Sequence, residues 1–239
     1  MLWVNPMIEL LEHYIGRSLP EPDEMSPQFE EEKLRAFQTN PNLRQKVQGR
    51  KLLPFFGNTT VFLLDDSIRQ QLSVLQEELY RKAGWMFADK LKGETFHMTL
   101  HDLVNGPELT GDLQGQMQEA EQKAKALLEG WRGQAPLQME ATWMFNMVNT
   151  SIVLGLAPAD NDSWERLDAM YTALQEVVPL NHGLTPHITM AYYRPDTYTV
   201  YDLKCLKEAL HPVALKITLQ MKDLVFQNFT DMNSYQTVF

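Results

Sequence analysis

The chain carries the same five-residue pattern twice, at positions 90 residues apart. The first copy, 96–100, is Phe-His-Met-Thr-Leu, and the second, 186–190, is Pro-His-Ile-Thr-Met. In an extended strand successive side chains point to opposite faces, so each copy places its histidine and its threonine together on one face. The apolar residues that follow them point to the other face. Both copies are therefore predicted to be strands with one side against a hydrophobic layer.

Strand-like and helix-like segments alternate around the two copies. A turn is expected at Val148-Asn149, and Asp162 with Glu165 has the spacing of a helix capping box. Periodicity predicts strands at 59–64, 95–104, 137–147, 150–156, 187–193, 214–219 and 224–229, and helices at 65–84, 112–131, 162–178 and 203–210.

The series of segments at 59–104 matches the series at 152–193, which indicates an internal duplication. We therefore predict an α+β protein of two lobes, with mainly antiparallel sheets, outer helices and a central cleft, over residues 54–239. The first 53 residues have a different pattern. Asn5-Pro6 and Ser26-Pro27 are typical of helix starts, so an N-terminal helical extension is predicted at 1–53.

The balance of charge limits the class of ligand. Lysine and arginine number 21 against 31 acidic residues, for a formal charge of −10, which argues against a protein that coats duplex DNA. A local pocket can still bind one phosphate, because exposed charges more than about 10 Å apart are largely screened. The basic residues Arg44, Lys46, Arg50 and Lys51 are interpreted as a solvated connector.

The expected location is the cytoplasm. No apolar run approaches the roughly 18 to 20 residues of a bilayer span, so we expect no membrane insertion. Residues 1–15 lack the features of a signal peptide. The single Cys205 excludes an internal disulfide and a cysteine-based zinc site, which fits a reducing compartment. The sequence leaves the oligomeric state open.

The candidate catalytic residues are His97 and His187, with Thr99 and Thr189 as candidates for binding a phosphate. Imidazole and hydroxyl lie about 6.5 Å apart along a strand, a spacing that lets both reach one tetrahedral phosphate. Opening a cyclic phosphodiester requires a neutral histidine that takes a proton from water and a protonated one that gives a proton to the leaving ribose oxygen. No metal or cofactor is expected.

Two structural histidines are the alternative. With six histidines in the chain, chance alone gives roughly 0.4 His-x-Thr matches, so a single copy would carry little weight. Two copies in matching positions of a repeat favour a shared function. His101 follows His97 at a zinc-binding spacing for a helix, but on a strand the two lie roughly 13 Å apart, so no shared metal is expected. His101 is interpreted either as lining the far end of the cleft or as a surface histidine.

Two further residues are candidates for the cleft. By alternation from His187, Tyr193 shares the catalytic face and Tyr192 does not. Arg194 follows the second strand and is a candidate phosphate clamp. Ordinary strand packing is the alternative for both tyrosines.

The stretches 56–61, 95–100 and 185–192 resemble the 2H phosphoesterase superfamily, the LigT-like cyclic phosphodiesterases, in a little-characterised branch found in bacteria and fungi. The resemblance covers about residues 54–239. It implies that His97 and His187 form the acid–base pair and that Thr99 and Thr189 bind phosphate. It also implies substrates such as 2′,3′-cyclic nucleotides, RNA ends with a cyclic phosphate, 2′-5′ linkages or ADP-ribose cyclic phosphate.

These observations together predict a metal-independent phosphodiesterase acting on a small nucleotide or a short RNA end. The alternatives are a non-catalytic binder of phosphorylated nucleotide or RNA on the same fold, and a metal-dependent hydrolase.

Overall fold

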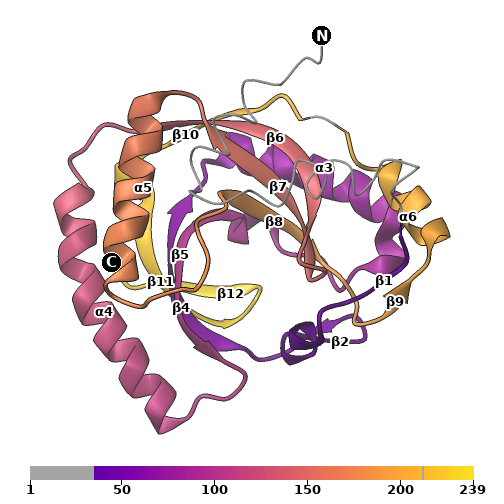
Figure 1. Cartoon of the computed structure of the whole chain (residues 1–239), viewed down its shortest axis with the longest axis horizontal. Coiled ribbons are helices and arrows are strands. Elements are labelled where there is room, and N and C mark those ends of the chain that lie inside the picture. Colours follow the sequence, from indigo (N-terminus) through magenta and orange to yellow (C-terminus); the bar gives the residue numbers. More distant parts are fainter. Residues whose placement is uncertain (1–34, 212) are drawn as a thin grey trace.

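The computed structural model describes residues 35–211 and 213–239 (Figure 1). The helices are α3 (Asp66–Ala83), α4 (Gly111–Trp131), α5 (Asn161–Gln175) and α6 (Val200–Lys207), with short 3₁₀ helices η2 (Pro41–Gln45), η3 (Gly84–Met86), η4 (Gly93–Thr95) and η5 (Met221–Asp223). The strands are β1 (Phe37–Gln38), β2 (Val47–Gln48), β3 (Lys51–Leu52), β4 (Phe56–Leu63), β5 (His97–Gly106), β6 (Leu137–Met147), β7 (Ser151–Pro158), β8 (His187–Tyr192), β9 (Thr197–Tyr198), β10 (Lys216–Leu219), β11 (Leu224–Asp231) and β12 (Ser234–Thr237).

Eight strands form one antiparallel sheet in the order β10-β6-β7-β8-β5-β4-β11-β12. The halves β10-β6-β7-β8 and β5-β4-β11-β12 are the two predicted lobes. They are joined where β5 pairs with β8, and the register there places Met98 opposite Ile188. The two histidine-bearing strands are therefore direct neighbours at the centre of the sheet, which confirms the predicted α+β architecture.

The helices lie outside the curled sheet (Figure 1), with α4 against β5, β4 and β11, and α5 against β6 and β7. Each begins at a side chain that caps free backbone N–H groups. Asp65, the cap of α3, accepts a hydrogen bond from the N–H of Ile68, as expected for a start at 65. The cap of α5 is Asp160, two residues before the predicted capping box at Asp162. The helix predicted at 203–210 begins earlier, because Thr199 and Asp202 form a capping box.

The segment 35–53 packs against one end of the half β10-β6-β7-β8, where β8 ends and β6 turns into β7. Strand β1 pairs with β9, and the backbone N–H of Asn40 donates to the carbonyl of Asn149 in the turn between β6 and β7. Leu43 and Val47 are each 1% exposed and belong to the main core. The helix starts predicted at Asn5 and Ser26 lie outside the described residues.

Two β-bulges occupy matching positions in the central strands. In β5, Thr60 pairs with His101 and Val61 with Thr99, so Leu100 is an extra residue. In β8, Ile152 pairs with Ala191 and Val153 with Thr189, so Met190 is the extra residue. Each bulge follows directly after a His-x-Thr motif. Directly after each bulge, the side chains point to the face opposite to the one that simple alternation predicts. In β5 a second register shift follows between Asp102 and Asn105.

Candidate active site

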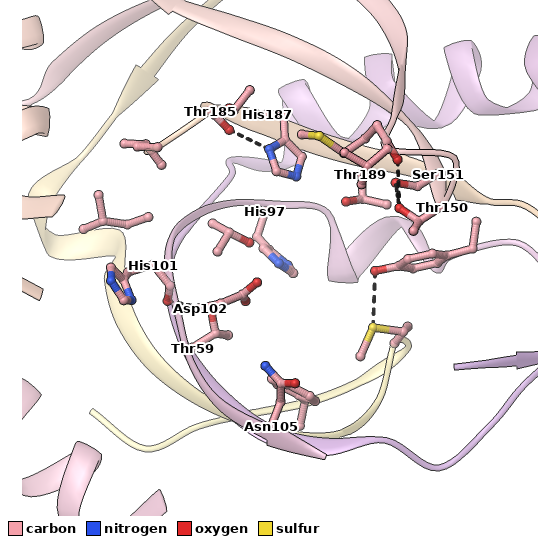
Figure 2. A pocket seen from close by; sticks show the side chains of 18 of the residues that line it. Thr59, His97, His101, Asp102, Asn105, Thr150, Ser151, Thr185, His187 and Thr189 are labelled. Carbon is pink, nitrogen blue, oxygen red and sulfur yellow. Dashed lines mark hydrogen bonds between the residues drawn. The ribbon is translucent and has the colours of Figure 1, made fainter. Parts of the chain in front are cut away.

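One cavity of about 510 Å³ lies between the two lobes. His97 and Thr99 of β5 line it, together with His187 and Thr189 of β8. Figure 2 shows His97, His187 and Thr189 around this space. The two imidazole rings thus face one space from neighbouring strands, and each has a threonine hydroxyl two residues further along. Both histidines are half-buried, so a ligand in the cavity can reach them.

Each histidine ring is held by the carbonyl two residues before it. Nδ1 of His97 lies 2.7 Å from the carbonyl oxygen of Thr95, and Nδ1 of His187 lies 2.6 Å from that of Thr185. A carbonyl oxygen can only accept, so Nδ1 carries the hydrogen in both rings. Nε2 is therefore the nitrogen that gains or loses a proton. This fixed tautomer suits a group that must act as base in one state and as acid in the other.

Burial lowers the pKa of both histidines from the ordinary 6.5. For His97, the hydrogen bond to Thr95 and the negative charge of Asp102 oppose the shift, and the charge of His187 adds to it. For His187, Thr185 and Asp102 oppose it, whereas His182 adds to it. The neutral, proton-accepting form is therefore favoured near pH 7, and an anion bound between the rings would raise both pKa values.

The two bulges place residues in the cavity that the sequence analysis missed. Asp102 and Tyr192 occupy equivalent positions, three residues after each motif threonine, and both line the cavity. Asp102 is exposed. His101 also borders the cavity, but it is only 1% exposed and its ring packs at 5.1 Å from that of Tyr171, so it is not a surface histidine. No sequence pattern marks the two bulges in advance.

Tyr193 and Arg194 do not line the cavity. The bulge at Met190 turns Tyr193 into the core, where it is fully buried among the rings of Phe37, Phe87 and Tyr198. The prediction from alternation therefore exchanged the two tyrosines. Arg194 forms an ion pair with Asp196 at 3.1 Å. The proposed phosphate clamp at Arg194 is not supported by this position.

Aromatic rings form much of the remaining wall. Tyr235 of β12 meets the ring of His97 edge to face, with 5.0 Å between centroids. Phe55 and Tyr192 line the side on which Lys46 enters the cavity. Lys46 is half-buried, so its interpretation as part of a solvated connector was wrong.

The described residues contain no group of three or more His, Cys, Asp or Glu side chains that could hold a metal ion. Around the two motifs the cavity offers the imidazoles of His97 and His187 with their Nε2 atoms available, the hydroxyls of Thr99 and Thr189, and the carboxylate of Asp102. That set can bind a phosphate, remove a proton at one point and deliver one at another.

Comparison with solved structures identifies the architecture. The structure of LigT from E. coli without ligand aligns over 78% of this chain and 96% of its own, with a TM-score of 0.50 and 14% identity. The chain has the fold of LigT. LigT complexed with 3′-AMP aligns equally well, with a TM-score of 0.50 over 77% of this chain. A conserved protein of unknown function from Agrobacterium tumefaciens, ATU0111, aligns over 88% of this chain with a TM-score of 0.59 and 14% identity.

No protein-family model and no curated protein matches the sequence. Within the described part of the chain, no helix combines the length and apolar character needed to cross a bilayer.

Proposed function

We propose that the protein is a 2H phosphoesterase that hydrolyses a cyclic phosphodiester or a 2′-5′ linkage of a nucleotide or RNA end, without a metal ion. The observation that carries this proposal is the pair His97 and His187, which face one cavity with equivalent hydrogen bonds at Nδ1. The LigT fold supports it, and LigT itself has been crystallised with 3′-AMP, a nucleotide of the kind that opening a cyclic phosphate releases.

In the proposed reaction the phosphodiester lies in the cavity, against the histidine and threonine side chains of the two central strands. The neutral histidine takes a proton from water at Nε2 while the water oxygen forms a bond to phosphorus. The bond from phosphorus to the leaving ribose oxygen breaks, and the protonated histidine gives that oxygen its proton. Thr99 and Thr189 donate hydrogen bonds to the non-bridging oxygens. The two rings exchange protonation states in each turnover, and the starting state returns when solvent takes one proton from the first ring and supplies one to the second.

A substrate panel tests this proposal. Wild-type protein is incubated with 2′,3′-cyclic AMP, a 2′-5′ dinucleotide, a 3′-5′ dinucleotide and a short RNA ending in a cyclic phosphate, and products are identified by mass spectrometry. We expect at least one of the cyclic or 2′-5′ substrates to gain one water, with equal rates in buffer and in EDTA. Loss of activity in EDTA would favour the metal-dependent alternative.

Variants separate the enzyme from the non-catalytic binder. His97→Ala and His187→Ala are each expected to lose turnover while keeping the fold, and Arg194→Ala is the control because Arg194 pairs with Asp196 away from the cavity. Binding of 3′-AMP by a wild-type protein that turns over none of the substrates would contradict the proposed hydrolysis and favour the binder.

A further inference from the structure

Lys46 is the only lysine or arginine among the described residues that line the cavity. Its Nζ lies 4.6 Å from the centroid of the Phe55 ring and 6.0 Å from that of Tyr192. It forms no ion pair within 4.0 Å with any described carboxylate. Burial lowers its pKa, and the negative charge of Asp102 opposes the shift only in part. Among the described residues, only the charge of Asp102, farther than an ion-pair distance, offsets that of this lysine.

The backbone fixes Lys46 in place. It ends the 3₁₀ helix η2, where its N–H donates to the carbonyl of Leu43 at 2.9 Å, and its own carbonyl accepts from the N–H of Leu53 at 2.8 Å. The neighbouring side chains of Leu43 and Val47 are buried in the core. The ammonium group is therefore brought to the cavity by a rigid part of the fold, not by a free surface side chain.

Lys46 lies beside a part of the cavity separate from the histidine pair. Its ring contact Phe55 comes just before Phe56, which pairs with Gly106, nine residues beyond His97 in β5. Its other ring contact, Tyr192, is the last residue of β8, five residues beyond His187. Lys46 therefore approaches the ends of the two motif strands that lie away from the histidines, a position suited to a second phosphate of the same substrate. Because Nζ already covers the face of Phe55, that ring face is not available to stack a base.

We propose that Lys46 binds a second phosphate of the substrate, at the 5′ position of the reacting nucleotide. The enzyme should then prefer a nucleotide with a 5′-phosphate, or the last nucleotide of an RNA strand, whose 5′ position also carries a phosphate. The disfavoured substrate is the nucleotide with a free 5′-hydroxyl. This inference rests on the proposed function for the reacting phosphate. The second phosphate forms charge-assisted hydrogen bonds with Nζ and supplies the missing counter-charge.

The experiment compares kcat/KM for adenosine 2′,3′-cyclic phosphate with and without a 5′-phosphate. Wild type is expected to prefer the 5′-phosphorylated form by about 10-fold to 100-fold, the range that a hydrogen bond to a charged group typically supplies. Lys46→Gln should reduce this ratio toward one, and Lys46→Arg should keep most of it. Lys51→Ala, which removes the same charge from an exposed position, should leave the ratio at the wild-type value.

Two kinetic results would overturn the inference: a wild-type ratio near one, or a Lys46→Gln variant that loses activity equally on both substrates. The second result would mean that Lys46 contacts the reacting phosphate or supports the fold. If wild type hydrolyses neither substrate, the proposed function fails separately, and calorimetry decides the role of Lys46. Wild type must then bind adenosine 3′,5′-bisphosphate more tightly than 3′-AMP, whereas Lys46→Gln must bind the two ligands with similar affinity. Equal affinities of wild type for the two ligands would reject the inference.

Discussion

The bulge in β8 depends on one buried side chain of helix α3. Gln76 is 4% exposed, and its Nε2 donates to the carbonyls of Leu91 at 3.1 Å and of Met190 at 3.0 Å. Met190 is the extra residue of the bulge. Gln76→Leu keeps a similar side-chain volume but removes both donors. Each buried carbonyl that loses its partner costs about 1 to 3 kcal/mol, so with two carbonyls the free energy of unfolding should fall by about 2 to 6 kcal/mol.

Urea denaturation measures this change. With an m-value of about 3 kcal/mol/M, the midpoint should fall by about 1 M. Gln71→Leu on the same helix is the control, because Gln71 is exposed, and its effect should stay within about 0.5 kcal/mol. A loss below about 1 kcal/mol for Gln76→Leu would refute the role assigned to its hydrogen bonds. We also expect lower activity from the folded variant, because Tyr192 depends on the bulge to face the cavity.

Three further predictions follow from the buried rings. Because burial lowers the pKa of both His97 and His187, the bell-shaped pH profile of kcat/KM should have its maximum below pH 6.5, and a maximum above pH 7 would contradict the assigned environment. Burial also lowers the pKa of His101, so the unfolded chain binds more protons below about pH 6.5 and stability falls as pH drops through that value. His101→Phe should weaken this dependence in denaturation at pH 7 and pH 5, and an unchanged slope would contradict it. The hydroxyl of Tyr193 is buried with no hydrogen-bond partner among the described residues, so Tyr193→Phe should leave the melting temperature equal or higher and activity unchanged, and a clear loss of either would show an unrecognised role.

The sequence was sufficient to predict the central strands and the faces of their first residues. Around His97 and His187 the apolar residues alternate regularly, and both motifs begin strands. The direct pairing of these two strands in one sheet was not predicted, because the repeat indicated only two lobes facing a cleft. Beyond Leu100 and Met190, alternation no longer predicts the face to which a side chain points, because each strand has one extra residue there. A bulge is stabilised by partners from distant elements, such as Gln76, and these contacts leave no local periodic signal.

The packing of segment 35–53, before β4, against the rest of the fold could not be predicted from the sequence either. Strands of two residues, such as β1 and β9, have no periodicity to detect, and their pairing depends on tertiary structure. Lys46 lies in a run of basic residues whose other members face solvent, so composition favoured a surface position for all of them. The tertiary structure buries Leu43 and Val47 in the core, and Lys46 between them lines the cavity.

The central claim is that two imidazoles act together as acid and base on one phosphodiester. Its most direct test is kcat for His97→Ala, His187→Ala and the double variant on 2′,3′-cyclic AMP, with circular dichroism to confirm folding. The kcat of each single variant is expected to fall by about 10²-fold to 10⁴-fold. The kcat of the double variant should be close to that of the less active single variant, because the two groups serve one step. A single variant that is folded and keeps more than a tenth of wild-type kcat would contradict the claim.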